Sequence, residues 1–428
     1  MTQRVGRARI LLVFFATAFA LTSFGLRQSM AATVQVGNCL SGPPHYSTIQ
    51  KAVNASAPGT TIRVCPGNYP EQVLITKTLT LTGVEGDTGS TPVITPPADG
   101  IVQNATGLAG SDAIGAQILV QNATGVNITG LTVDGSGNQL TCSPDLMGIY
   151  YQNASGIVSY VVTRNQNLGS GNECQSGEGI YAQSGYGFSG ASAVVIENSH
   201  VYAYQKNGVS GDGDTLTVTI SANDVVGQGP TPYVAQNGIQ ISDGTKGTVL
   251  SNSVSNDIYS GTSSSATGIL VIAASGISLE GNTVDSTQGI VVFSDGTYGS
   301  ADQTTIISNR VLDTNTFDGI DVCSNGNTVV SNAVFGSSEG GVHLDDSCVE
   351  LNGSPSGNNN TVTNNRVNDV CAGLLLGSGT ANTISPNAIF NAAYTNLAGD
   401  SCSATPSSGT GAQAKTRNRR PRALLVRP

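Results

Sequence analysis

A short motif recurs along most of this chain at a nearly constant interval, and this repeat constrains the fold more than any other feature. The motif is a glycine followed by an aliphatic residue. Its copies begin at Gly148, Gly179, Gly208, Gly238, Gly268, Gly289, Gly319, Gly341 and Gly373. Successive copies are 29 to 32 residues apart, except for two steps of 21 and 22 residues. Such regular units are typical of a solenoid, in which each repeat contacts only its neighbours.

A second motif, asparagine followed after one residue by valine or isoleucine, runs in phase with the first. Its copies begin at Asn223, Asn252, Asn282, Asn309, Asn332, Asn365 and Asn387. Around both motifs apolar and polar residues alternate and β-branched residues dominate, which predicts short strands. An antiparallel sandwich has short strands too, but it has no reason to repeat one motif at the same place in every unit. A coil that returns to its starting point does, because each strand then lies about 4.8 Å above its counterpart in a parallel sheet.

The asparagines and the N-terminal residues add detail to this coil. Asparagine tolerates left-handed backbone, and equivalent amides in stacked turns can form a hydrogen-bonded ladder. We interpret Asn-x-Ser/Thr triplets such as Asn122-Ala123-Thr124 in the same way, not as glycosylation sites.

Residues 47–50 match a capping box, which predicts a short helix that ends near Pro58-Gly59 and covers the first coil. Its apolar face is expected to consist of Ile49, Ala52 and Val53.

The two ends of the chain differ from the repeats between them. Residues 1–32 begin with Arg4, Arg7 and Arg9, followed by a short apolar run and small residues, which predicts an export signal rather than a membrane anchor. Residues 403–428 shift to small residues and then to Lys and Arg without acidic residues, which predicts a disordered basic tail. This tail is either a solubilising end or an arm that binds anionic envelope polymers. We therefore expect one β-helix domain over residues 33–402, in a periplasmic or extracellular monomer without a membrane span.

Eight cysteines in an exported chain favour disulfides over a metal cluster, because the compartment is oxidising and no Cys-x-x-Cys pair occurs. Neighbouring cysteines are expected to pair, as suits a solenoid. The predicted disulfides are Cys39 with Cys65, Cys142 with Cys174, Cys323 with Cys348, and Cys371 with Cys402.

Charge is unevenly placed along the chain. Four of the 18 Lys and Arg residues lie in residues 1–32 and six between Lys415 and Arg427. The remaining 8 face all 28 Asp and Glu residues, so the predicted β-helix carries a charge near −20. Such a surface should repel nucleic acid and anionic membranes, whose binding needs clustered cations. It also disfavours a polyanionic sugar unless a cation bridges the two.

Three N-terminal segments resemble the opening of pectin-lyase-like β-helix proteins: residues 48–53, 58–71 and 79–83. The Gly-Ile-x-Val and Asn-x-Val repeats resemble the right-handed β-helix repeats of the same superfamily, including its periplasmic copper-binding-type members. Together the resemblance covers roughly residues 33–402. It implies an all-β fold, a single-stranded right-handed parallel β-helix with a short N-terminal capping helix. It implies no single activity, because the superfamily includes lyases, hydrolases, epimerases and non-enzymatic proteins.

The third residue of each Gly-aliphatic-x-aliphatic unit should face solvent, because side chains alternate across a strand. Along the stack this position holds Tyr150, Tyr181, Ser210, Gln240, Leu270, Val291, Asp321, His343 and Leu375. We predict substrate binding at Tyr150, Tyr181 and Gln240. The two tyrosines are either sugar-stacking rings or an aromatic stack that stabilises the sheet. The apolar residues Leu270, Ile272, Val291, Val292 and Phe293 are expected to lie beneath a loop or the chain's own extension.

A dense group of ionisable residues near the C-terminal end includes a histidine. It consists of Asp318, Asp321, Glu339, His343, Asp345 and Asp346. Strand rise and spacing place Asp321 about 8 Å from Asp345, within the roughly 6.5–9.5 Å carboxylate separation of inverting glycosidases. If the protein is an enzyme, we expect Asp321, His343 and Asp345 to carry the chemistry, supported by Asp318 and Glu339. Carboxylates that cap turns or bind calcium would look the same.

The catalytic motifs of the superfamily favour no particular enzyme. Residues 315–321 resemble the first acidic motif of polygalacturonase-like hydrolases with one residue inserted, but Glu339-Gly340 stands where that family has paired aspartates. The Gly-His-Gly and Arg-Ile-Lys motifs, the arginine cluster of pectate-lyase-like enzymes and the epimerase-type Asp-Pro-His-Asp motif are missing. Residues 211–214 form an acidic turn that could hold calcium, the one cofactor left open. With only three histidines and three methionines, the chain offers few ligands for copper, and we assign no metal ligand.

Two functions remain open from the sequence. The protein binds or acts on a neutral or calcium-bridged polysaccharide along its exposed face, as a glycosidase or lyase would. Alternatively it is a non-catalytic structural or surface-interaction solenoid.

Overall fold

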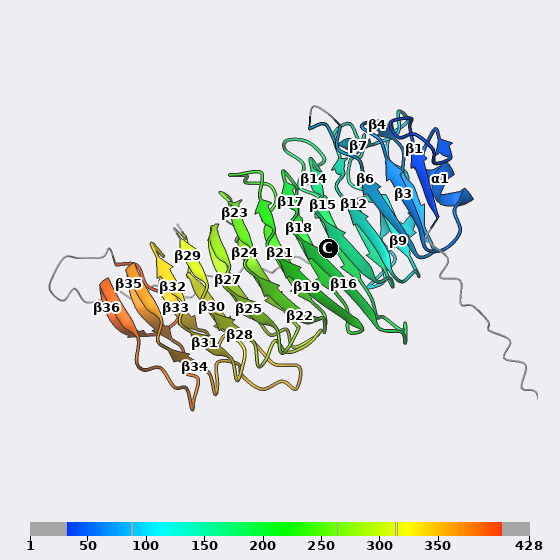
Figure 1. The fold of residues 1–428 in the computed structure, drawn as a ribbon. Coiled ribbons are helices and arrows are strands. Elements are labelled where there is room, and N and C mark those ends of the chain that lie inside the picture. Colours follow the sequence, from blue (N-terminus) through cyan, green and yellow to red (C-terminus); the bar gives the residue numbers. More distant parts are fainter. Residues whose placement is uncertain (1–31, 87–88, 263, 313, 315, 405–428) are drawn as a thin grey trace, which may run out of the picture. The chain divides into compact units, whose positions relative to one another are not determined.

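The computed structural model describes residues 32–86, 89–262, 264–312, 314 and 316–404. Over these residues one chain winds into a stack of coils whose short strands form parallel sheets (Figure 1). The predicted export signal and basic tail lie almost entirely outside the described residues. Within the described part no helix is both long and apolar enough to cross a membrane.

Equivalent strands of successive coils stack in three columns. The first column is a separate sheet: β2 (His45–Tyr46), β1 (Thr33–Val36), β3 (Thr60–Val64), β6 (Leu79–Gly83), β10 (Val126–Thr129), β13 (Gly156–Ser159), β16 (Ser192–Glu197), β19 (Leu216–Ser221), β22 (Lys246–Leu250), β25 (Ser278–Glu280), β28 (Thr305–Ile307), β31 (Thr328–Val330) and β34 (Thr361–Thr363).

The second column carries the Asn-x-Val motif: β4 (Gly67–Pro70), β7 (Pro92–Thr95), β11 (Thr132–Asp134), β14 (Val162–Arg164), β17 (His200–Tyr202), β20 (Asp224–Val226), β23 (Ser253–Asp257), β26 (Thr283–Ser286), β29 (Arg310–Leu312), β32 (Ala333–Phe335) and the first half of β35 (Arg366–Leu376).

The third column carries the Gly-aliphatic motif: β5 (Val73–Ile75), β9 (Ala113–Gln121), β12 (Asp145–Gln152), β15 (Glu178–Gln183), β18 (Asn207–Asp212), β21 (Asn237–Ser242), β24 (Thr267–Ile272), β27 (Gln288–Phe293), β30 (Ile320–Cys323), β33 (Gly340–Leu344) and the second half of β35. The last strand, β36 (Ala388–Ala398), pairs with both halves of β35 and so belongs to the second and third columns. A two-residue strand, β8 (Ala105–Thr106), pairs with β9 in antiparallel fashion.

The aliphatic residues of the third column lie in register and form the core. Ile239 pairs with Ile269, then Ile290 and Ile320 follow in the next strands, and all four are fully buried. The residue before each of these isoleucines must be glycine, because there is no room for a side chain at that position. A Cβ on Gly238 would lie 2.2 Å from the side chain of Val254 in the second column and 2.7 Å from the carbonyl oxygen of Gly268. The two repeated motifs therefore pack against each other in every coil.

The asparagines form the predicted ladder. From Asn223 to Asn387, each amide nitrogen donates to the side-chain oxygen of the asparagine in the next coil. The same oxygen also accepts the backbone N–H of the preceding asparagine. Stacked turns are thus joined at each step.

The short helix α1 (Ile49–Ala55) buries Ile49, Ala52 and Val53 as predicted, and it contacts β1, β3 and β5. It ends at Ala55, three residues earlier than expected. Its N-cap is Thr48, whose side chain accepts from the N–H of Lys51, rather than the Ser47 of a capping box. Glu71 accepts the N–H groups of Ile49 and Gln50, so a carboxylate from the next coil completes the cap.

All four disulfides join the cysteines that the sequence spacing predicts: Cys39 with Cys65, Cys142 with Cys174, Cys323 with Cys348, and Cys371 with Cys402. Each pair is 25 to 32 residues apart. These bonds therefore link chain segments about one coil apart.

One expectation is corrected: the outward row of the third column is buried rather than solvent-facing. Tyr150 is 0% exposed, Gln240 5%, and Asp321 and His343 2% each. Neighbouring side chains in a parallel sheet are close enough to shield one another. Ala105 and Ile114 also pack on the tyrosine end of the row, and Cys402 packs on the Leu375 end. Val292, which was grouped with the outward apolar residues, instead lies in the inner core.

Candidate functional site

The register of the third column aligns the predicted outward residues in one row. Tyr150 pairs with Tyr181, then follow Ser210, Gln240, Leu270, Val291, Asp321, His343 and Leu375 in successive strands. The row contains two polar parts separated by an apolar band. We describe them from the N-terminal end.

The rings of Tyr150 and Tyr181 are stacked, with centroids 5.2 Å apart and planes 10° from parallel. Both hydroxyls are held by hydrogen bonds: Tyr150 donates to Gln183 over 2.6 Å, and Tyr181 donates to Asp212 over 2.9 Å. The pair lies in one cluster with Ala105, Ile114 and Met147. The flat face of Tyr150 is thus packed, whereas Tyr181 borders open space.

That space is a groove of about 140 Å³ along the outward face. Two of the three predicted binding residues, Tyr181 and Gln240, line this groove. Its lining includes Tyr181, Gln183, Asp212, Gln240 and Ser242 from β15, β18 and β21. Gln240 accepts a hydrogen bond from Asn237, and Asp212 accepts from Gln183 and Ser242. Tyr150 does not line the groove.

A second, shallow depression of about 580 Å³ lies beside the aromatic pair. Its lining has no ionisable side chain among the described residues, and most of it is amide: Gln103, Asn104, Gln121, Asn122, Gln152 and Asn153. Gln152 also donates to the hydroxyl of Tyr150, so this depression and the aromatic pair are connected.

The structure adds ionisable residues at this end that the sequence reasoning missed. Burial, followed by the charge of Asp112, raises the pKa of Asp145 in the groove to about 6. Burial raises the pKa of Glu178 to about 7 and lowers that of Lys206 to about 8. Burial and then Asp243 raise the pKa of Asp212. Glu178 stands directly before the repeated Gly179 and pairs in register with Asn207, but this position does not reveal that its side chain is buried.

Leu270, Ile272, Ala273 and Val291 form the apolar band, with Phe293 packed against them. The band occupies β24 and β27, between the groove and the acidic cluster. It is separate from the inner core of the coil.

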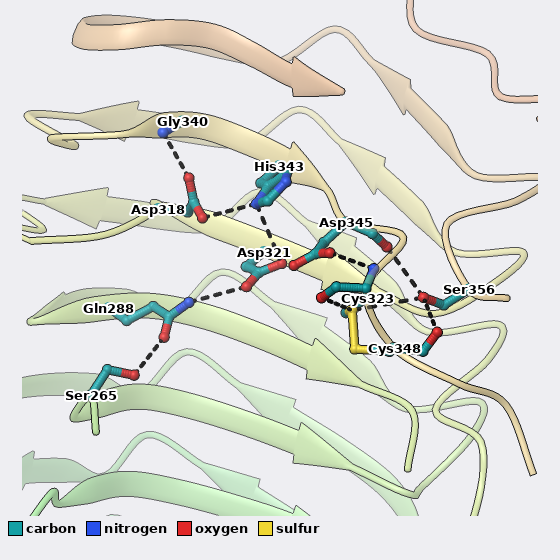
Figure 2. Close-up of polar contacts among 11 residues, drawn as sticks. Ser265, Gln288, Asp318, Asp321, Cys323, Gly340, His343, Asp345, Cys348 and Ser356 are labelled. Atoms are coloured by element: carbon teal, nitrogen blue, oxygen red, sulfur yellow. Dashed lines mark hydrogen bonds and ion pairs between the residues drawn. A yellow bond between two sulfur atoms is a disulfide. The ribbon is translucent and has the colours of Figure 1, made fainter. Parts of the chain in front are cut away.

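Beyond the band, Asp318, Asp321 and His343 meet as predicted, and Figure 2 shows the polar contacts that join them. The Nδ1 atom of His343 lies 3.0 Å from Asp318 Oδ2 and 3.9 Å from Asp321 Oδ1. Asp318 also accepts the backbone N–H of Gly340 over 2.7 Å. On the other side, Gln288 donates to Asp321 over 3.1 Å. The ring of His343 in β33 is therefore held by two carboxylates of the preceding coil, Asp318 just before β30 and Asp321 within it.

These carboxylates decide the protonation state of His343. Burial alone would lower its pKa, but Asp318, through its charge and hydrogen bond, acts in the opposite direction together with Asp321 and Asp345. The result is a pKa of about 10. His343 is consequently an imidazolium cation at neutral pH.

The structure also brings Asp345 to this cluster. Asp345 and Asp400 each have an oxygen within 4.8 Å of a ring nitrogen of His343. Asp345 also accepts the N–H of Ser347. Glu339 is half-buried just before β33.

Metal binding can be judged from the donor set. Two groups in the described part have ligand atoms within 4.8 Å of one another: Asp318, Asp321 and His343, and His343, Asp345 and Asp400. Both contain the histidine, whereas calcium prefers oxygen ligands. A ligating histidine must be neutral, which opposes the raised pKa of His343. In the turn proposed for calcium, the Asp212 carboxylate instead binds Tyr181, Gln183 and Ser242.

Comparisons with known proteins identify the fold. The family model for a right-handed beta helix region matches residues 233–389. Among solved structures, the A-module of the mannuronan C-5 epimerase AlgE6 from Azotobacter vinelandii is 15% identical with a TM-score of 0.51, covering 82% of this chain and 89% of that one. The GH136 lacto-N-biosidase from Eubacterium ramulus is 11% identical with a TM-score of 0.51, covering 84% and 68%. A search of curated proteins gives no match. The coil is thus a right-handed parallel β-helix, as the sequence predicts.

Proposed function

We propose that this right-handed β-helix protein is exported and acts on a polysaccharide that lies along the outward face of its third column. The observation that carries the proposal is the row itself. Stacked tyrosines, a polar groove and an acid–histidine cluster follow one another on equivalent positions of a single face. A surface with equally spaced positions suits a polymer of repeated units. Two solved structures of similar fold are named as an epimerase of mannuronan and a lacto-N-biosidase.

Binding is assigned to the N-terminal half of the row. The edge of Tyr181 and the side chains of Gln183, Gln240 and Ser242 offer an aromatic surface and hydrogen-bonding groups, which is the combination that sugars require. The neighbouring amide-lined depression favours a neutral sugar. The strongly acidic surface favours the same class, because it repels a polyanion.

Chemistry is assigned to the C-terminal half. Because Asp318 and its acidic neighbours raise the pKa of His343 to about 10, the ring favours its protonated form at neutral pH, and we assign the acid and base roles to Asp321 and Asp345. In hydrolysis one carboxyl group would protonate the leaving oxygen while the other would accept a proton from the attacking water. Asp318 would hold the ring of His343 in place through its contact with Nδ1.

The test is to replace Asp321 or Asp345 by Asn and measure depolymerisation of a panel of neutral and acidic plant and bacterial polysaccharides. Each variant should lose more than 99% of turnover while its Tm and its binding to the same polysaccharide stay close to those of the wild type. Asp99→Asn is the matched control, because Asp99 is an exposed aspartate far along the chain from the cluster. Full activity in the double variant would move the chemistry to another part of the molecule.

A non-catalytic solenoid is the second candidate. It is favoured by the burial of the cluster: Asp321, His343 and Asp345 are each 2% exposed, and a permanently charged histidine between carboxylates is typical of a structural ion pair. In that case the panel would show no cleavage, and Asp321→Asn would lower the Tm by several degrees.

A further inference from the structure

We propose that the groove beside Tyr181 binds a sugar unit that carries a protonated amine, held by the carboxylates of Asp112 and Asp145. This assignment rests on the proposed function and names the class of polysaccharide, one in which amine-bearing sugars occur among neutral ones. Three observations lead to it: the charge of the groove lining, two carboxylates without protein partners, and a buried amide donor that faces the groove.

The groove lining is acidic throughout. Its charged side chains are carboxylates, those of Asp112, Asp145, Asp212 and Asp243. Among the described residues no Lys, Arg or His belongs to the lining. Carboxylates gathered in a cleft focus their electric field and raise the local concentration of cations. The groove therefore favours a cationic ligand, whereas the neighbouring depression offers amides.

Two of these carboxylates already have donors from the protein. Asp212 accepts hydrogen bonds from Tyr181 and Ser242. The hydroxyl of Tyr186 lies 3.0 Å from one oxygen of Asp212 and 3.0 Å from one oxygen of Asp243. These contacts fix one end of the groove and leave little capacity there for a ligand.

The other two, Asp112 and Asp145, differ. Neither side chain forms a hydrogen bond or an ion pair with another described residue. Asp112 is exposed just before β9, and Asp145 is the half-buried first residue of β12. Burial, followed by the charge of Asp112, raises the pKa of Asp145 to about 6, so the two carboxylates are close enough to repel each other. An ammonium group between them would remove this repulsion and favour the ionised form of both.

Gln240 is a separate sign of a ligand. It is 5% exposed and lines the groove. Its Oε1 accepts from Asn237, but its Nε2 donates to no described residue. A buried donor without an acceptor is costly, so a bound group is expected to supply one. A hydroxyl or ring oxygen of a sugar can accept this hydrogen bond, which an ammonium ion alone cannot.

The carboxylate pair suits an ammonium group better than a metal ion. In the described part, the groups with three ligand atoms within 4.8 Å of one another all include His343, and none lies in the groove. Calcium takes about 6–8 oxygen ligands, far more than Asp112 and Asp145 provide. An ammonium group has only three donors to satisfy. Tyr298, which is 59% exposed in the lining, adds an aromatic ring for a cation or a sugar.

The groove and the amide-lined depression are adjacent, which suits a polymer with two kinds of unit. Gln183 of the groove pairs in register with Gln152 of the depression. The two hollows therefore lie one strand apart. A chain that crosses both would place a neutral unit against the amides and an amine-bearing unit against the carboxylates.

Calorimetric titration of the full chain with two matched oligosaccharides tests the assignment. One is the β-1,4-linked tetramer of glucosamine, and the other is its fully N-acetylated form, which has the same backbone without the charge. At pH 6.5 with EDTA present, the glucosamine tetramer should bind about tenfold more tightly. Asp145→Asn should abolish this preference and leave the affinity for the N-acetylated tetramer unchanged. Its Tm should not fall, because the Asp145 side chain has no hydrogen bond to lose.

Asp99→Asn is the matched control, because Asp99 is an exposed aspartate outside the groove lining, and this variant should keep the preference. Equal affinity of the wild type for both tetramers would overturn the proposal. An equal loss of the preference in Asp145→Asn and Asp99→Asn would also overturn it, since the preference would then come from the net charge of the β-helix.

Gln240→Leu separates an amino sugar from a simple amine. It should weaken the binding of both tetramers and leave the binding of spermine unchanged. If spermine binds as tightly as the glucosamine tetramer, and Gln240→Leu weakens neither, the groove takes amines rather than sugars and the proposal fails. Binding of the N-acetylated tetramer alone would overturn this proposal but leave the proposed function standing. Failure of both tetramers and of every polysaccharide in the panel would overturn both.

Discussion

At the scale of single residues, the environment on the sheet decides the chemistry. His343 lies in the same row as Leu375 and Val291, yet Asp318 and Asp321 turn it into a buried cation. At the other end of the row burial makes Glu178 a weak acid, with its pKa raised to about 7. Both pKa values are thus raised, that of Glu178 by burial and that of His343 by neighbouring carboxylates.

The raised pKa of His343 predicts a pH dependence of stability. Because its folded pKa of about 10 exceeds the value of 6.5 for a free histidine, its stabilising contribution should be complete below pH 6.5 and lost as the pH rises towards 10. The Tm difference between wild type and His343→Gln should therefore be large at pH 6 and small at pH 10, as followed by calorimetry. His45→Gln, at an exposed position, should show no such trend. A Tm difference that grows with pH would contradict the ion-pair assignment.

At the scale of the element, each coil depends on a turn in which one asparagine forms hydrogen bonds with the asparagines of the preceding and the following coil. Asn309, for example, accepts from the backbone and side chain of Asn282 and donates to Asn332 and to the carbonyl of Leu279. It is 1% exposed, so water cannot replace these bonds. The regular spacing of the coils follows from this shared use of one side chain.

Replacing Asn309 by Ala leaves two buried donors of Asn282 without an acceptor. Each such group costs about 1–3 kcal/mol, so the free energy of unfolding should fall by about 2–6 kcal/mol in urea titrations. Asn387→Ala, at the half-exposed end of the ladder, should cost about 1 kcal/mol, because water can reach the groups it releases. Equal losses at both positions would show that burial does not increase the contribution of the ladder to stability.

At the scale of the whole molecule, contacts connect each coil mainly to the coils directly before and after it. The free energy of unfolding is then roughly a sum of contributions from each coil and its contacts with adjacent coils. A destabilising change at one end should therefore affect mainly the coils at that end. The four disulfides follow the same rule, since each joins residues about one coil apart.

Replacing both Cys371 and Cys402 by Ser tests this locality. Amide hydrogen exchange should become faster in β35 and β36, while β12, β15 and β18 keep the exchange rates of the wild type. Mass spectrometry of peptic fragments can measure this. Faster exchange throughout the β-helix would mean that the stack unfolds as one cooperative unit.

The sequence alone determined the coil, its register, the asparagine ladder and the cysteine pairs, because each depends on a short motif that recurs at the same place in every repeat. Alternation of side chains across a strand was enough to place Ile239 inside and to align Asp321 with His343. Only the tertiary structure decided what lies over the outward row and how its residues ionise. Those properties depend on segments distant in sequence, such as Ala105 and Ile114 packed on Tyr150, and on neighbours in other strands, such as Asp318 beside His343. Glu178, Lys206 and Asp145 escaped the sequence reasoning for the same reason: burial, not spacing, shifts their pKa values, and no repeat records burial.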